Sequence, residues 1–271
     1  MTVSRFVLAG MSDIGLDGFV MSSVENSDLI ARIVRENGWW TFERPLPALF
    51  VRCAQKWPGL FVDVGANTGF YSLLHAAVAP EGRSIAFEPF PPAAAVLREN
   101  IALNLLDDRI SLRPEAVSAA EGAARLFVPP PLHGLLESRS SLERSFSDTH
   151  DADLKVEATS LDGLGDALAG LSILKIDVEG HELAVLTGGR ETIGKYRPLV
   201  IMGVLGQDHL ALDAIRANAG YRSVLLGGDE VITQAALAPD PRGWNHILVP
   251  EEKWGAFTSV VVSTGVRLSK S

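Results

Sequence analysis

The sequence has a single cysteine, Cys53, so no disulfide can form within the chain, and the class of disulfide-rich extracellular domains is excluded. It has no apolar run near the roughly 18 residues typical of a membrane-spanning helix. Ser12 and Asp13 interrupt the short apolar run at 6–11, so no signal peptide is predicted. Basic residues number 24 against 33 acidic ones, a formal charge of −9, which argues against a general nucleic-acid binder. These absences predict a cytoplasmic protein with no nucleic-acid partner and no membrane partner.

What the sequence does contain is the composition of an ordinary globular chain, with 47% hydrophobic and 21% charged residues among 271. From residue 58 onward, short apolar runs alternate with segments of helical spacing. Continuously apolar strands alternating with helices are typical of an α/β fold, a doubly wound, mainly parallel sheet with helices on both faces. The expected strands are 60–64, 84–87, 110–117, 172–176, 199–204, 221–226 and 246–249, and the expected helices are 71–79, 93–105, 209–219 and one from 182 onward.

Two segments stand outside this alternation. Residues 1–57 have stretches of helical spacing but no chemical motif, and we expect an N-terminal helical extension or a lid over a pocket. Residues 58–271 are expected to form a Rossmann-like domain. Within it, residues 118–160 contain a proline run and a serine-rich stretch, which predict a loop or hairpin insert. Its expected strands are 126–128 and 155–158.

The segment FVDVGANTG at 61–69 lies where an expected strand is followed by a helix. Gly65 and Gly69 let the backbone turn tightly and let a ligand approach it closely. The N-terminus of the following helix offers free N–H groups to a carboxylate, and Asp63 is suited to hold an ammonium group. Asn67 stands where the dinucleotide-binding fingerprint G-x-G-x-x-G has its second glycine, which disfavours nicotinamide binding. We interpret the segment as a ligand-binding turn, with a purely structural turn as the alternative.

A carboxylate follows the next expected strand. Glu88, in AFEP at 86–89, comes about 20 residues after the glycine turn, where a carboxylate can accept hydrogen bonds from both hydroxyls of a ribose. The alternative is an exposed acid that favours the start of the next helix. The glycine turn upstream favours the ribose role.

Four titratable residues follow the fourth expected strand: Asp177, Glu179, His181 and Glu182. In a doubly wound sheet this strand ends beside the glycine turn, and ligands bind at such carboxyl ends. Histidine and glutamate at this place are candidate general bases, although the glutamates also suit a helix start and His181 also suits a solvated surface. The Asp-x-Glu spacing is compatible with a divalent cation, but no further ligand is identifiable and no metal site is predicted.

At these three segments the sequence resembles the FkbM-type family of S-adenosylmethionine-dependent methyltransferases. The resemblance covers about residues 58–205, and its ordered combination of motifs is more specific than the glycine turn, which many methyltransferases share. The matching stretches are FVDVGANTGFYS at 61–72, AFEPFP at 86–91, LKIDVEGHE at 174–182, the spaced residues Leu97, Asn100 and Asn104, and TSLD at 159–162.

The resemblance implies a class I methyltransferase fold with a seven-stranded sheet. It implies S-adenosylmethionine as the methyl donor, S-adenosylhomocysteine as its product, and transfer usually to an oxygen of a sugar or secondary metabolite. By position, the resemblance implies that the methionine part of the cofactor would be surrounded by Asp63, Gly65, Ala66, Asn67, Thr68 and Gly69. The ribose would lie at Glu88 and Pro89, and the adenine near Ala116 and Val117. The donor site would lie close to Asp177.

Methyl transfer from a sulfonium to an alcohol requires in-line alignment and removal of the acceptor's proton. We expect His181 or Glu179 to be that base because both follow Asp177, so these three are the predicted catalytic residues. One position departs from the family pattern: Gly203 stands where members often carry a glutamate at the end of the fifth strand.

Three other functions are alternatives to a small-molecule methyltransferase. Gly203 motivates a domain that binds the cofactor without catalysing transfer. A nicotinamide-dependent dehydrogenase is disfavoured by Asn67. An RNA or DNA methyltransferase is disfavoured by the charge of −9 and by the lack of an Asn-Pro-Pro-Tyr-type base-holding motif.

Overall fold

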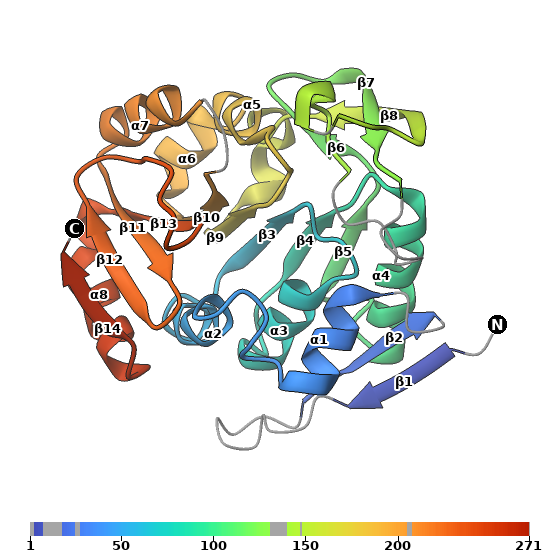
Figure 1. The fold of residues 1–271 in the computed structure, drawn as a ribbon, viewed down its shortest axis with the longest axis horizontal. Coiled ribbons are helices and arrows are strands. Elements are labelled where there is room, and N and C mark those ends of the chain that lie inside the picture. The colour runs from blue at the N-terminus through green and yellow to red at the C-terminus, as the bar shows by residue number, and fades with distance from the viewer. Residues whose placement is uncertain are drawn as a thin grey trace.

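The computed structural model describes residues 3–7, 18–24, 28–130, 140–146, 148–204 and 208–270. Its centre is one large sheet (Figure 1), in which five neighbouring strands are parallel and the strands beyond them mix both directions. In spatial order the strands are β14 (Arg267–Lys270), β12 (Glu230–Gln234), β11 (Tyr221–Gly227), β13 (Asn245–Pro250), β10 (Leu199–Gly203), β9 (Leu171–Ile176), β3 (Leu60–Val64), β4 (Ser84–Phe87) and β5 (Ile110–Arg113).

The predicted fold class, a doubly wound and mainly parallel α/β sheet, is confirmed. The described sheet has nine strands where seven were expected, because β12 and β14 extend it beyond β11. The five parallel strands are β5, β4, β3, β9 and β10, and parallel neighbours need a crossover connection, usually through a helix.

Helices cover both faces of the sheet (Figure 1). One face carries α1 (Leu29–Asn37), α2 (Leu46–Lys56), α3 (Phe70–Val78), α4 (Pro91–Leu103) and α8 (Trp254–Ser263). The other carries the 3₁₀ segment η4 (Asp162–Leu168), α5 (Glu182–Thr187), α6 (Arg190–Tyr196) and α7 (His209–Asn218). Among the residues that the structure describes, no helix combines the length and apolarity that a membrane span requires.

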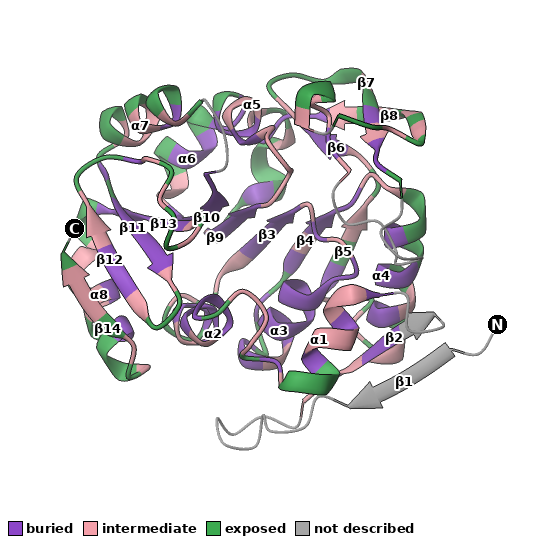
Figure 2. Cartoon of the chain, in the orientation of Figure 1, coloured by how far each residue is buried: buried purple, intermediate pink, exposed green. Residues whose placement is uncertain are grey.

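Side chains alternate between the two faces along each central strand, because successive Cβ atoms of a strand point to opposite sides. Phe61 and Ile173 pack in the core beneath α2 and α3, whereas Val62 and Leu174 pack in the core beneath α5 to α7. All four are fully buried, and Figure 2 shows buried residues along the central strands. Burial on both faces explains why these strands are apolar without interruption.

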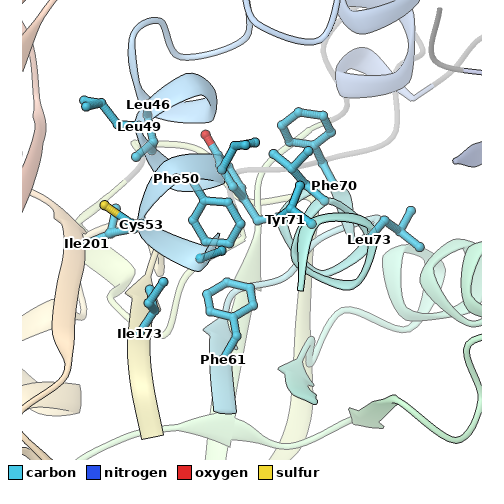
Figure 3. Packing of buried hydrophobic residues seen from close by; sticks show 14 of the residues in the cluster. Leu46, Leu49, Phe50, Cys53, Phe61, Phe70, Tyr71, Leu73, Ile173 and Ile201 are labelled. Carbon is cyan, nitrogen blue, oxygen red and sulfur yellow. The ribbon is translucent and has the colours of Figure 1, made fainter. Parts of the chain in front are cut away.

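Helix α2 belongs to the packing of the central sheet. Its Phe50 ring lies 5.0 Å from that of Phe61 on β3 and 5.2 Å from that of Tyr71 on α3, centroid to centroid (Figure 3). The region before residue 58 is not purely helical, because β1 (Val3–Val7) and β2 (Val20–Val24) form a separate antiparallel pair. A domain boundary at residue 57 stays a prediction.

Asn100 and Asn104, whose spacing resembles that of the FkbM-type family, connect this N-terminal strand pair to α4. The Asn100 side chain accepts from the Ser22 backbone N–H at 2.6 Å and donates to the Thr68 carbonyl oxygen at 2.7 Å. The Asn104 side chain accepts from the Val20 N–H and donates to the Val20 carbonyl oxygen. These side chains therefore stabilise both β2 and the glycine turn.

The single strand expected at 110–117 was wrong. The chain forms β5 and then, after Pro114, the short β6 (Ala116–Val117), because proline has no N–H to continue a ladder. In the insert region β6 joins a three-stranded sheet of order β6-β8-β7, with β7 (Gly122–Val128) antiparallel to β8 (Ala152–Thr159). The expected strands 126–128 and 155–158 lie within β7 and β8. Part of the serine-rich stretch, at 138, 139 and 147, lies outside the described residues.

Candidate functional site

The carboxyl ends of β3, β4 and β9 open into a cavity of about 410 Å³. Its walls also come from the segment before α2, from β6 and from Ser140 and Leu142 of the insert. The cavity brings together Asp63, Gly65, Ala66, Asn67, Glu88, Pro89, Ala116, Val117, Asp177, Glu179 and His181, which are all of the predicted site residues except Thr68 and Gly69.

Gly65 lets β3 turn beneath the cavity without obstruction. Its φ of +80° is in the left-handed region, and a β-carbon there would overlap the carbonyl oxygen of Asp177. The N–H groups of Gly65 and Ala66 both donate to the carbonyl oxygen of Phe87, at 3.0 and 2.9 Å. These contacts hold the ends of β3, β4 and β9 close together.

Thr68 and Gly69 are not among the cavity-lining residues. Gly69 has a φ of +94° and begins α3, and a β-carbon there would overlap the Leu97 side chain. Thr68 is fully buried, and its carbonyl oxygen accepts from Asn100. Both residues shape the turn.

Glu88 is held rigidly at the end of β4. One carboxyl oxygen accepts from the Asn67 N–H and the other from the Phe90 N–H, both at 2.8 Å. Each oxygen keeps a second lone pair, as a ribose diol would need. Burial raises the pKa of Glu88 to about 7, although these two hydrogen bonds oppose the rise.

Three carboxylates surround one lysine at the floor of the cavity. The Lys175 Nζ lies 2.6 Å from an Asp177 carboxyl oxygen and 4.9 Å from the centroid of the Tyr71 ring. The Tyr71 hydroxyl donates to Glu43 at 2.8 Å. Ser72 donates to one carboxyl oxygen of Asp63 at 2.8 Å, and no described group donates to the other, which is buried.

The electrostatics of this cluster favour a cationic ligand. Burial raises the pKa of Asp63 and of Glu43, although the Lys175 charge opposes the rise. Burial alone would lower the pKa of Lys175, but Asp177, Glu43 and Asp63 raise it above its ordinary value. The lysine therefore stays charged. It can neutralise only one of the three carboxylates when all of them are ionised. A bound cation would offset that excess.

His181 has a partner at each ring nitrogen. Its Nδ1 lies 2.7 Å from a carboxyl oxygen of Glu143, and its Nε2 lies 2.9 Å from the Ser118 hydroxyl. His181 and Glu179 both line the cavity. The described residues contain no group of three or more His, Cys, Asp and Glu side chains placed to hold a metal ion.

The sequence reasoning missed Glu43, Tyr71 and Lys175 as site residues. Lys175 is the one charged residue of β9, LSILKI, and a charge within a buried strand was a readable signal. Glu43 had no such signal. Its place in the cavity depends on a left-handed backbone conformation, with a φ of +52°, in the segment between α1 and α2. Phe42 and Trp244 also line the cavity and were missed as site residues.

Comparison with known proteins gives a consistent result. A family model described as "Methyltransferase FkbM domain" matches residues 63–223. Methyltransferase sdnD of Sordaria araneosa is 30% identical over 152 residues, which cover 47% of this chain and 59% of that protein. The 2-O-methyltransferase NoeI of Sinorhizobium fredii (strain NBRC 101917 / NGR234) is 27% identical over 161 residues, which cover 54% of this chain and 64% of that protein.

The chain spans less than two thirds of the length of these curated relatives. Among solved structures, it is similar to a methyltransferase FkbM from Methylobacillus flagellatus KT, with a TM-score of 0.47 and 16% identity. That match covers 69% of this chain and 42% of the other.

Proposed function

Because the chain belongs to the FkbM methyltransferase family, we propose that it transfers the methyl group of S-adenosylmethionine to a hydroxyl oxygen of a small acceptor, a sugar or a secondary metabolite. The observation that carries this proposal is a single cavity that combines a glycine turn, a ribose-type carboxylate and a buried acidic cluster. The name of one relative, 2-O-methyltransferase NoeI, supports oxygen as the accepting atom. A small-molecule acceptor is compatible with a cavity of about 410 Å³.

The residues present fit the donor. The buried carboxyl oxygen of Asp63 without a described partner is suited to an ammonium group, directly or through water. Each carboxyl oxygen of Glu88 keeps a lone pair that could accept from a ribose hydroxyl, and Ala116 and Val117 offer an apolar wall for an adenine. When bound, S-adenosylmethionine supplies an electrophilic methyl group on a positively charged sulfur. The excess of buried acid beside Lys175 favours such a cation.

The rest of the reaction is positioning and proton removal. The contacts between the strand ends hold the glycine turn fixed, so a donor bound there would be held in one place. Holding donor and acceptor in line can lower the barrier by several kcal/mol. Asp177 is paired with Lys175 at 2.6 Å, so we assign it a role at the donor site rather than as the base. Glu179 and His181 border the same cavity and are the candidate bases for the acceptor hydroxyl.

Donor binding is tested by calorimetric titration of the full chain with S-adenosylmethionine and S-adenosylhomocysteine. We expect both to bind with micromolar affinity and Glu88→Ala to weaken both at least about tenfold, since it loses hydrogen bonds to a charged group. Glu81→Ala, an exposed acid outside the cavity, is the matched control and should bind as the wild type does. No binding of either compound to folded protein would contradict the proposal.

Methyl transfer is then tested with radiolabelled donor and a panel of sugars and hydroxylated metabolites. Labelled product whose methyl group is released by ether-specific cleavage would support O-methylation. Tight donor binding without product across the panel would favour a domain that binds the cofactor only. Gly203, which borders the cavity without a side chain, makes this comparison necessary.

A further inference from the structure

A short segment of the insert, residues 140–146, contacts the loop after β9 at three points. The Ser141 hydroxyl donates to the carbonyl oxygen of Glu179 at 2.7 Å. The Phe146 ring lies against Gly180, where a β-carbon would come within 3.1 Å of it. Glu143 reaches the Nδ1 of His181 at 2.7 Å, and its own N–H donates to the Ser141 hydroxyl at 2.9 Å. Side chains far apart in the sequence thus fix this loop.

The two partners of His181 determine which ring nitrogen carries the proton. An ionised carboxylate can only accept hydrogen bonds, so opposite Glu143 the Nδ1 must donate. In a neutral ring the Nε2 then holds the lone pair, and the Ser118 hydroxyl donates to it at 2.9 Å. The side chain of His181 is only 12% exposed, so the ring cannot turn freely.

We propose that Glu143 is a positioning residue that holds His181 in the Nδ1–H tautomer, so that Nε2 takes the proton of the acceptor hydroxyl. This inference rests on the proposed function. As the acceptor oxygen bonds to the methyl carbon, the carbon–sulfur bond breaks and its electron pair stays on sulfur. The acceptor O–H proton goes to Nε2, and the imidazolium beside Glu143 later loses it to water.

The arrangement also indicates which of the three groups reacts. Serine, histidine and an acid in this order occur in serine hydrolases, where the serine oxygen faces the substrate. Here His181 lines the cavity and Ser118 is not among the lining residues, so the ring is the reactive group. The single lone pair of Nε2 accepts from the Ser118 hydroxyl in this structure, so an alcohol acceptor would take the place of Ser118 in that hydrogen bond.

The deciding experiment records two-bond ¹H–¹⁵N correlations of the histidine rings in the ¹⁵N-labelled full chain at pH 8. The His181 signals are assigned by their loss in His181→Ala. We expect the wild-type ring in the Nδ1–H form and a large Nε2–H population in Glu143→Gln. Glu143→Asp should restore part of the Nδ1–H form. Ser118→Ala, which removes the partner of the other nitrogen, is the matched control and should keep it.

A wild-type ring in the Nε2–H or the doubly protonated form would overturn the proposal, as would an unchanged tautomer in Glu143→Gln. S-Adenosylhomocysteine binding, measured on the same samples, separates this failure from failure of the proposed function. Normal binding with the wrong tautomer overturns only the role of Glu143. No binding to folded wild-type protein overturns the methyltransferase reaction and, with it, the proton transfer.

A rate measurement completes the test with an acceptor found in the panel. Glu143→Gln is expected to lower kcat at least about tenfold, within the range that a positioned general base contributes. The KM for S-adenosylmethionine should stay within about twofold, because Glu143 is not among the cavity-lining residues. Equal losses in donor affinity and kcat would indicate a purely structural role and overturn the inference.

Discussion

At the scale of single residues, Gly65 is a position where the backbone leaves little freedom for a side chain. Gly65→Ala must accept both a left-handed φ of +80° and an overlap with the carbonyl oxygen of Asp177. Gly170→Ala is the matched control, because its φ is +82° but a β-carbon there would meet nothing within 4 Å. We expect Gly170→Ala to cost about 1 kcal/mol and Gly65→Ala at least about 2 kcal/mol more.

Chemical denaturation measures both variants, and calorimetry of S-adenosylhomocysteine measures the effect on the cavity. Gly65→Ala should also lose most donor binding, because the strand ends have to separate. Equal stability losses in the two variants would show that the overlap relaxes without cost.

Glu88 gives a prediction about pH. Its pKa is raised from the ordinary 4.5 to about 7 by burial, so its contribution to stability is complete below pH 4.5 and is lost as the pH rises through 7. Gln cannot titrate. Glu88→Gln should therefore gain stability relative to the wild type between pH 4.5 and 8, by up to about 3 kcal/mol at about 1.4 kcal/mol for each pKa unit.

Urea unfolding of both proteins across this pH range gives the difference directly. Because glutamine has one carbonyl oxygen for the two N–H groups of Asn67 and Phe90, the offset between the curves can have either sign. The prediction therefore concerns how the difference in unfolding free energy between Glu88→Gln and the wild type changes with pH, and not its absolute value. A constant difference would mean that Glu88 titrates near its ordinary value.

At the scale of elements, α2 is a part of the core although it precedes the first strand of the sheet. Phe50→Ala removes a fully buried ring packed against Phe61 and Tyr71, so we expect a loss of about 3 to 5 kcal/mol. Gln55→Ala, on the exposed side of the same helix, should change stability by less than about 0.5 kcal/mol. Thermal and urea unfolding measure both, and a small loss in Phe50→Ala would place α2 outside the cooperative core.

The elements also show what could be predicted from the sequence. Strands β3 and β4 matched at both ends, because an apolar run is bounded there by turn-forming residues and followed by a glycine turn or Glu88-Pro89. Helix α8 was not predicted. Its sequence WGAFTSVVVS is rich in β-branched residues, and it is helical because Phe257 and Val261 pack into the core. The glycine turn and Glu88 were readable as a site for the same local reason, whereas Glu43 reaches it only through the folded chain.

At the scale of the whole molecule, the proposed donor would bridge the ends of β3, β4 and β9. A ligand that binds only the folded state stabilises all of it, so S-adenosylhomocysteine at 100 times its Kd should raise the free energy of unfolding by about 2.7 kcal/mol. Thermal unfolding with increasing ligand measures this. Adenosine, which lacks the methionine part and its ammonium group, should give a smaller rise at the same concentration.

A rise with adenosine as large as that with S-adenosylhomocysteine would indicate that the acidic cluster at Asp63 and Lys175 does not contact the ligand. Glu88→Ala gives a second check, because it should reduce the ligand-induced increase in unfolding free energy for both compounds.

The side chains of the segment 140–146 have two different roles. Ser140 and Leu142 line the cavity, whereas Ser141 and Glu143 hold the loop that carries Glu179 and His181. Substitutions at 140 and 142 would therefore leave these contacts to the loop in place. Under the proposed function, a laboratory library confined to these two codons would sample other acceptors while Glu143 and His181 stay unchanged.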